Sequence, residues 1–188
     1  APSWGSVVNG YYTLQGNWDQ MRTNYLTKFF IIGITFYGLQ TLQGPLQGLR
    51  TLNAFFHYTD WVVGHVHMGT MGWVAMVISA SFYYMIPKVT GRELYSVKLA
   101  SIHFWLILVG QLAWTITMWI GGIQQGAMWK ATNPDGSLMY SFLDALTSLY
   151  PYYRMRFAAG VVYFIGILVF AWNLIQTVRQ EPSAAAEA

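Results

Sequence analysis

Residues 61–69, WVVGHVHMG, begin an apolar run that continues to Pro87 and decides the fold of this chain. A helix needs about 20 predominantly apolar residues to cross the hydrocarbon core of a bilayer, and the run 61–87 is long enough to do so. The sequence therefore predicts a membrane-spanning helix that carries two histidines, His65 and His67, near its beginning.

The spacing of these two histidines predicts that they have separate partners. On a helix with 3.6 residues per turn, side chains two positions apart point roughly 200° from each other. His65 and His67 therefore cannot easily chelate one small ion together, but each can bond a partner on its own side of the helix. Ionisable residues inside a membrane span are costly, rare and functional by default. An axial bond to haem iron is a common role for an imidazole in an apolar bundle.

Small residues follow His65 at helical spacing, namely Gly69, Gly72, Met76 and Ser79. They predict a helix surface to which a flat macrocycle could lie close. The alternative is close packing of a neighbouring helix, which is the usual role of small residues in membrane helices. The glycines alone favour helix packing, whereas the histidine pair favours a cofactor.

The composition places the chain among membrane proteins. Only 9% of its 188 residues are charged and 55% are hydrophobic, whereas soluble domains average roughly 25% charged residues. The absence of cysteine excludes disulfides, iron–sulfur ligation and a thiol nucleophile. The net charge of +3 is scattered along the chain and forms no nucleic-acid patch. We therefore expect an all-α polytopic membrane protein.

Hydropathy predicts about four transmembrane helices in a unit spanning residues 29–179. They are expected at about 29–49, 61–87, 99–124 and 155–178, with an amphipathic interfacial helix near 139–150. Residues 1–28 are interpreted as an interfacial segment or the end of a span, and 180–188 as a tail. Four spans bring both termini to one side of the membrane, where six Lys and Arg residues lie against four on the other. This excess predicts cytoplasmic termini.

Two polar features are expected to meet the histidine span. Gln40, Gln43 and Gln47 form one stripe on the preceding span, which should face the bundle or a cofactor; hydrogen bonds to neighbouring helices are an equally good explanation. His57 and Asp60 lie in the link before the histidine span. Asp60 could be an N-terminal cap and His57 a solvated loop residue. Alternatively, both meet charged cofactor groups at the membrane surface, such as haem propionates.

A family resemblance emerges from these residues. The run HYTDW (57–61) followed by GHVH (64–67) resembles the catalytic subunit I of cbb3-type cytochrome c oxidases, the C family of haem–copper oxidases. The resemblance extends over nearly the whole chain, through PSWG (2–5) with Asn9-Gly10, KFF (28–30), TFYG (35–38), MWKATNPDG (128–136) and YPY (150–152).

The resemblance implies roles for individual residues. His65 would be the axial ligand of a high-spin haem b, where oxygen is reduced, and His67 an axial ligand of a low-spin haem b. His57 and Asp60 would lie in the region of the haem propionates. Gln43 stands where the family has a glutamate that interacts with the proximal histidine. A neutral amide there would make His65 less imidazolate-like.

The resemblance also implies a fold and an activity. The chain would be the C-terminal part of a larger 12-helix subunit I bundle, either as a fragment or as a naturally split partner. That subunit would belong to a terminal respiratory oxidase, which reduces oxygen to water with electrons from cytochrome c and translocates protons. Its expected partners are the remaining helices of the subunit, membrane-anchored c-type cytochrome subunits, cytochrome c and the lipid of a bacterial inner membrane, with no nucleic acid.

The histidine count limits what this chain can ligate. After His65 and His67 only two histidines remain, so a copper ion is expected in the complete subunit without a ligand from this chain. The cofactors expected here are two b-type haems. A related nitric oxide reductase and a non-catalytic membrane cytochrome b remain alternatives.

Overall fold

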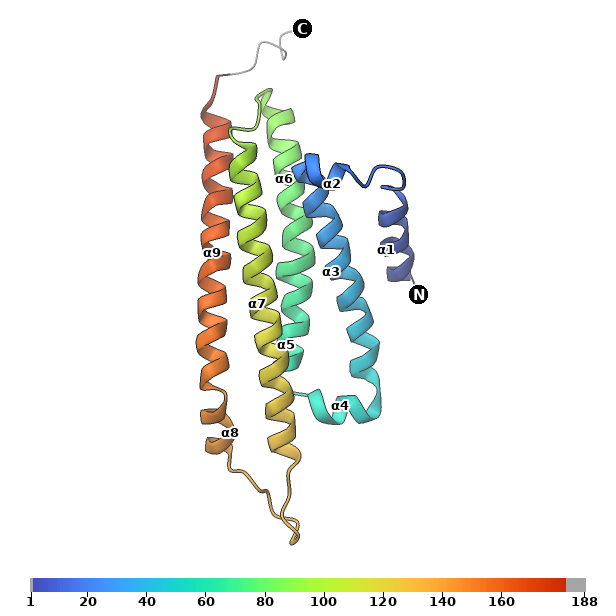
Figure 1. Cartoon of the computed structure of the whole chain (residues 1–188), viewed down its shortest axis with the longest axis vertical. Coiled ribbons are helices and arrows are strands. Elements are labelled where there is room, and N and C mark those ends of the chain that lie inside the picture. The colour runs from blue at the N-terminus through green and yellow to red at the C-terminus, as the bar shows by residue number, and fades with distance from the viewer. Residues whose placement is uncertain (1, 182–188) are drawn as a thin grey trace.

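A computed structural model describes residues 2–181, and this part of the chain is built from helices (Figure 1). In chain order they are α1 (Pro2–Tyr12), α2 (Gln20–Thr23), α3 (Tyr25–Gly48), α4 (Arg50–Phe56), α5 (Asp60–His67), the π-helix η1 (Met68–Val74), α6 (Ala75–Thr90), α7 (Val97–Lys130), α8 (Phe142–Ser148) and α9 (Tyr150–Arg179). The all-α class predicted from the sequence is confirmed. Most of the tail expected at 180–188 lies outside the described residues.

Three helices in the described part are long and apolar enough to cross a membrane. They are the continuous helix formed by α5, η1 and α6 (Asp60–Thr90), then α7 and α9. The region expected to form the first span is helical as α3, whose 24 residues extend over about 36 Å. Its glutamine stripe, together with Pro45, lowers its hydropathy below that of the other three helices. That α3 crosses the membrane stays a prediction.

The interfacial helix expected near 139–150 corresponds to the shorter α8. A capping box begins this helix, because the Ser141 hydroxyl and the Asp144 carboxylate each bond the other residue's backbone N–H. The hydrogen bond from the Ser141 hydroxyl lowers the pKa of the Asp144 carboxyl below its ordinary value. The stabilisation that this cap provides is therefore complete at pH values above the ordinary pKa of an aspartate. It is lost as the pH falls through the lowered pKa of Asp144.

Local capping also sets the boundaries of α3, α6 and α7. The Asn24 side chain accepts a hydrogen bond from the Leu26 N–H and begins α3, and the Ser96 side chain accepts one from the Leu99 N–H and begins α7. Gly91 ends α6 in a left-handed conformation with φ of 63°, which glycine adopts without steric cost. The chain then turns back into α7.

The long helices lie side by side, with α7 between α9 and the histidine span, and with α3 and then α1 on the other flank (Figure 1). Glycines bring α7 close to both neighbours. A Cβ at Gly110 would meet backbone atoms of Ala159 and Tyr163 on α9, and one at Gly122 would meet the backbone of Trp61. The core combines aromatic, methionine and small residues: Phe29, Phe36, Met68, Met76, Ala80, Tyr83, Ala100, Phe104, Ile107 and Tyr163.

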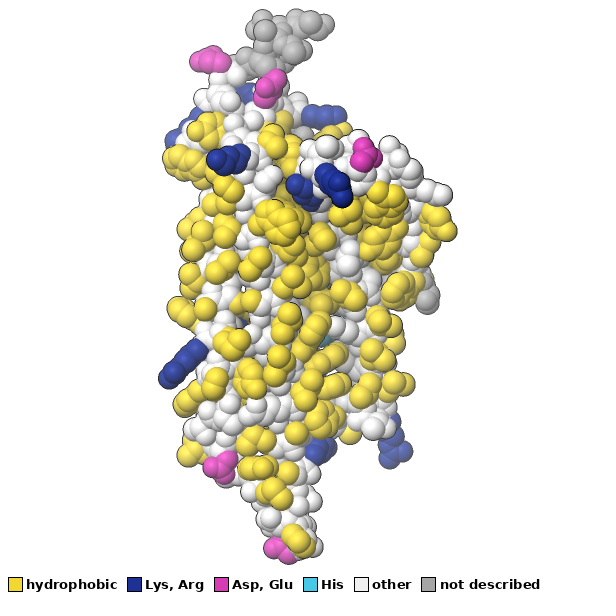
Figure 2. Space-filling model, in the orientation of Figure 1, with side chains coloured by type: hydrophobic (Ala, Val, Ile, Leu, Met, Phe, Trp, Pro, Cys, Tyr) yellow, Lys and Arg dark blue, Asp and Glu magenta, His cyan; other side chains and the backbone are white. Residues whose placement is uncertain are grey.

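The surface has the distribution of a membrane protein. Figure 2 shows hydrophobic side chains covering the middle of the visible face, with most Lys and Arg side chains towards its ends. Many large apolar side chains on α7 and α9 are exposed, including Trp105 and Trp172 at more than half of their surface. Lipid or further helices can cover such a face without cost, whereas water cannot.

The close α7–α9 contact predicts a large effect at Gly110. In Gly110→Ala the added Cβ would lie 2.8 Å from the Tyr163 backbone nitrogen and 3.0 Å from the Ala159 carbonyl oxygen. Neither backbone atom can move alone, so we expect destabilisation of about 1–3 kcal/mol, measured by thermal unfolding of the purified protein in detergent. Gly44→Ala is the control, because a Cβ there meets nothing within 4 Å. Equal unfolding temperatures for the two variants would contradict the contact.

Candidate functional site

The histidine helix is fixed at its first turn by side chains around it. The Thr59 hydroxyl accepts a hydrogen bond from the Trp61 N–H at 3.3 Å and donates one to the Phe56 carbonyl at 2.7 Å. The Asp60 N–H donates to Oε1 of Gln125 on α7 at 2.8 Å. The first N–H groups of a helix have no partner within the helix, so Thr59 and Gln125 hold the start of α5 in place.

His65 faces α3. Its Nδ1 lies 3.1 Å from Oε1 of Gln43, so the glutamine stripe of α3 is in contact with the histidine helix. Its ring is nearly parallel to that of Trp61, with centroids 6.4 Å apart, and Trp61 in turn stacks on Trp119 of α7. The imidazole is thus held by one amide oxygen and one aromatic face.

His67 faces α7 instead. Its Nδ1 lies 2.7 Å from the Val63 carbonyl oxygen one turn earlier, and its ring stacks on Trp114 with centroids 5.3 Å apart. The two imidazoles therefore contact different neighbouring helices. This is the divergent arrangement that their spacing in the sequence predicts.

These contacts define which ring nitrogen is free. A carbonyl oxygen can only accept, so Nδ1 of His67 carries the proton and donates it to Val63. Nδ1 of His65 donates to Gln43 in the same way. Within residues 2–181 no hydrogen bond reaches Nε2 of either ring. In a neutral imidazole, a donated Nδ1–H leaves the lone pair on Nε2, which is the usual arrangement of a metal-ligating histidine.

Gly69 and Gly72, which follow His65, pack against a neighbouring helix, which is the alternative that the glycines alone favoured. A Cβ at Gly69 would meet the Gln40 side chain, and one at Gly72 would meet the Phe36 ring. Both partners belong to α3, which covers this face. The sequence pattern assumed a regular α-helix, but residues Met68–Val74 form a π-helix.

Unpaired polar atoms gather around the histidines. Within the described residues, the buried side-chain atoms without a hydrogen-bond partner include Oδ2 of Asp60 and Nε1 of both Trp114 and Trp119. Buried polar groups normally have partners. Asp60 begins the histidine helix, Trp114 stacks on His67, and Trp119 stacks on Trp61. The site therefore has unused polar capacity that a bound group with acceptor and donor atoms would satisfy.

Arg156 is a candidate functional residue that the sequence analysis did not single out. Its guanidinium lies 5.8 Å from the ring centroid of Trp114 and close enough to Asp60 for electrostatic interaction. With Trp114, Tyr153 and Phe157 it lines a cavity of about 530 Å³. The signal was an arginine within the first turns of an apolar helix, where a cation is costly without an anionic partner.

His57 is separate from the histidine pair. It is exposed and lines a different cavity, of about 360 Å³, together with Tyr58, Trp129 and Lys130. Its imidazole makes no hydrogen bond within residues 2–181. Tyr58 beside it has a left-handed backbone with φ of 65°, which is rare for a bulky residue. Of the two residues expected near charged cofactor groups, only Asp60 lies at the histidine helix.

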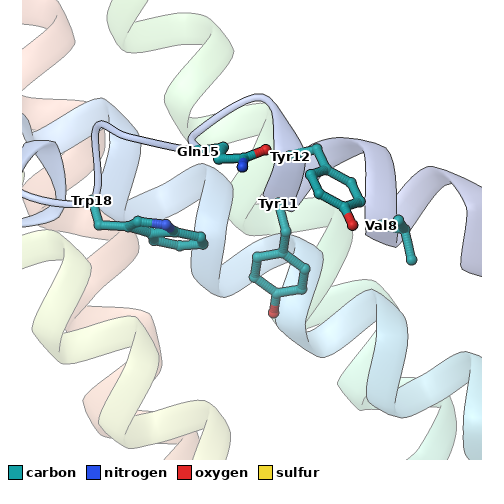
Figure 3. A pocket seen from close by; sticks show the side chains of 5 residues that line it. All are labelled: Val8, Tyr11, Tyr12, Gln15 and Trp18. Atoms are coloured by element: carbon teal, nitrogen blue, oxygen red, sulfur yellow. The ribbon is translucent and has the colours of Figure 1, made fainter.

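Other candidate sites are few in the described part of the chain. No group of three or more His, Cys, Asp and Glu residues there could hold a metal ion. An open cavity of about 420 Å³ beside α1 contains no titratable carboxylate or histidine (Figure 3). It is lined by Val8, Tyr11, Tyr12, Gln15 and Trp18.

Comparison with known proteins agrees with the resemblance found in the sequence. The family described as "Cytochrome C and Quinol oxidase polypeptide I" matches residues 1–162. The chain is 43% identical to "Cbb3-type cytochrome c oxidase subunit CcoN1" of Stutzerimonas stutzeri, over 100% of this chain and 40% of that protein. A more distant relative is a nitric oxide reductase polypeptide of the same species, at 24% identity over 77% of this chain and 31% of its own length.

The fold also matches a solved structure. The cryo-EM structure of a heme-copper terminal oxidase dimer shares it with a TM-score of 0.68, at 20% identity, over 92% of this chain and 33% of that chain. The chain spans between a third and two fifths of the length of curated relatives that it matches. It therefore corresponds to one part of a longer helical bundle.

The contact between Gln125 and the first turn of α5 predicts a local effect. In Gln125→Leu the Asp60 N–H loses its acceptor, so we expect a loss of about 1 kcal/mol and roughly fivefold faster hydrogen exchange at that turn. Mass spectrometry of the peptide covering residues 59–64 measures the exchange. Gln124→Leu is the control, since Oε1 of Gln124 accepts from the Tyr152 hydroxyl instead. Unchanged exchange in Gln125→Leu would show that Thr59 alone holds this turn.

Proposed function

The chain belongs to the cytochrome c and quinol oxidase polypeptide I family, and from that membership we propose that it is the haem-binding part of the catalytic subunit of a terminal respiratory oxidase. The complete enzyme would reduce oxygen to water with electrons from cytochrome c and translocate protons. One observation carries the proposal. Two imidazoles of one helix are each held through Nδ1, with Nε2 free, and lie against different neighbouring helices.

This arrangement fits two b-type haems, one on each side of the histidine helix. His65 would bind the high-spin haem, where oxygen reacts, and His67 the low-spin haem. When bound, haem iron supplies the one-electron redox chemistry and the oxygen-binding position. The chain itself supplies axial nitrogen ligands whose protonation and orientation are already fixed by Gln43 and Val63.

Other residues of the chain would support the same role. Gln43 sets the basicity of His65 through the bond to Nδ1, because the partner of a ligating histidine tunes its donor strength. Arg156 supplies a positive charge that an anionic group such as a haem propionate would neutralise, and it lies against Trp114, on which the His67 ring stacks. Asp60 lies in the first turn of the histidine helix. His57 would reach a propionate only from its separate surface cavity.

The remaining parts of the site would come from outside this chain. We propose that a copper ion and its ligands, the second axial ligand of the low-spin haem and the rest of the 12-helix bundle belong to the rest of the subunit. Membrane-anchored c-type cytochrome subunits would deliver electrons. A bacterial inner membrane, with the termini of this chain on the cytoplasmic side, fits the excess of Lys and Arg at that end.

Nitric oxide reduction is the second candidate, because the chain also resembles a nitric oxide reductase polypeptide at lower identity. Gln43 also supports this second candidate, because the oxidase pattern has a glutamate beside the proximal histidine and this chain has a neutral amide there. Metal analysis of the purified complex separates the possibilities. Copper indicates an oxidase, non-haem iron in its place indicates a nitric oxide reductase, and the absence of a high-spin haem indicates an electron-carrying cytochrome b.

The two histidines predict distinct spectral losses in the purified complex. His65→Ala should abolish carbon monoxide binding while the low-spin haem spectrum is retained, and His67→Ala should remove the low-spin spectrum first. Optical difference spectra of the reduced complex, with and without carbon monoxide, measure both effects. His103→Gln is the control, since His103 is buried against Tyr83 and Phe29, away from the pair. If either alanine variant kept both spectra, the assignment would be wrong.

The Gln43–His65 contact predicts a change in redox potential. In Gln43→Glu a carboxylate would accept from Nδ1 of His65, and hydrogen bonds to charged groups are stronger by about 1 kcal/mol. We therefore expect the midpoint potential of the high-spin haem to fall by roughly 40 mV, measured by redox titration. Gln47→Glu places the same charge one turn away, where the Gln47 side chain donates to the Gln43 backbone carbonyl and not to His65. If the midpoint potential shifted equally in both variants, the added charge alone would change the potential and the hydrogen bond to His65 would have no effect.

A further inference from the structure

The π-helical segment after His67 leaves one backbone carbonyl without a helical partner. In a π-helix each N–H bonds the carbonyl five residues earlier, and in an α-helix four residues earlier. Ala75 still bonds the Thr70 carbonyl in the π pattern. The α-helix begins there, so the next amide, that of Met76, pairs with the Gly72 carbonyl. The Met71 carbonyl between these two is passed over.

Tyr163 on α9 fills this gap. Its hydroxyl donates to the Met71 carbonyl oxygen at 3.1 Å, across a separation of 92 residues. The Tyr163 side chain is 8% exposed and belongs to the hydrophobic core. An unpaired carbonyl inside a membrane protein costs several kcal/mol because no water can reach it. The tyrosine hydroxyl therefore stabilises the π-helical form of this segment over a regular α-helix.

Gln111 on α7 holds the other end of the segment. Its Nε2 donates to the carbonyl of His67, the residue that immediately precedes η1, at 3.1 Å. The Gln111 side chain is fully buried, and its Oε1 has no partner. A buried amide with an unpaired oxygen is unfavourable for stability alone. The same Nε2 also donates to the Thr115 hydroxyl at 2.7 Å within α7, so the bond to the His67 carbonyl is the contact that this amide makes with the histidine helix.

We propose that Tyr163 and Gln111 are positioning residues that clamp the π-helical segment and thereby set the direction of the two histidines. Gln111 of α7 bonds the His67 carbonyl and Tyr163 of α9 bonds the Met71 carbonyl, four residues later in the chain. A π segment accommodates one extra residue, and one residue corresponds to a rotation of about 100° on an α-helix. The clamp therefore fixes how His65 and His67 are rotated relative to α6, which Tyr83 and Met76 anchor in the core.

The inference rests on the proposed haem-binding function and is tested with the complete complex. Tyr163→Phe removes the hydroxyl and keeps the ring. A neutral hydrogen bond contributes about 1 kcal/mol, so the fraction of molecules with an altered histidine orientation should rise about fivefold. The electron paramagnetic resonance spectrum of the oxidised low-spin haem reports imidazole orientation. We expect a second, shifted low-spin signal, with haem content retained.

Tyr83→Phe is the matched control. It also removes one buried tyrosine hydroxyl, which bonds Nδ1 of His103 at the same 3.1 Å, but it does not touch η1. We expect this variant to lose stability and to keep the native low-spin signal. If the two variants show the same spectrum, Tyr163 is merely structural. If the unsubstituted complex contains no low-spin haem, the proposed function itself fails, and the two outcomes are thus distinct.

Gln111→Met provides a second test that does not depend on Tyr163. Methionine has a similar volume and removes the unpaired Oε1, but it also removes the donor to the buried Thr115 hydroxyl. These two effects on stability oppose each other, so the unfolding temperature should change little. The low-spin signal should nevertheless split as in Tyr163→Phe, because the His67 carbonyl loses its clamp. Hydrogen exchange of the peptide covering residues 68–76 should increase in both clamp variants and stay unchanged in Tyr83→Phe. A native signal and native exchange in Gln111→Met would overturn the inference.

Discussion

Polar backbone and side-chain groups inside a membrane have no water to bond, and each must find a partner within the protein. The histidine helix of this chain departs from a regular α-helix, so it depends on side chains of its neighbours. Gln125 bonds its first turn, Gln43 bonds the His65 ring, Gln111 bonds the His67 carbonyl and Tyr163 bonds the Met71 carbonyl. These four contacts come from three different helices and place the helix in the bundle.

Amides serve this purpose better than charges would. An amide can donate and accept without the desolvation cost of an ionised group, so glutamines can lie on the inner faces of α3 and α7. The charged exceptions near the histidines are Asp60, in the first turn of the histidine helix, and Arg156, which lies against the Trp114 ring. The presence of Arg156 there fits an anionic partner, and it links the protein framework to the proposed haem chemistry.

The small residues of the histidine span pack against a neighbouring helix, as the glycines alone indicated. Gly69 and Gly72 follow His65 at α-helical spacing, and both are covered by α3. The π-helix shifts every residue after His67 relative to the histidines, and no residue pattern predicted it. The glutamine stripe was predicted more successfully, because a polar face on an apolar helix must turn towards the protein, and Gln43 indeed meets His65.

The sequence by itself determined the all-α membrane class, the family and the divergence of His65 and His67, because these follow from composition, from a local motif and from the 3.6-residue turn. It also placed a polar face of α3 inside the bundle. Only the tertiary structure decided which groups hold the histidines. The partners of the Met71 and His67 carbonyls lie 92 and 44 residues away in the chain. Contacts of that separation depend on how whole helices pack, and a local pattern of residues does not encode them.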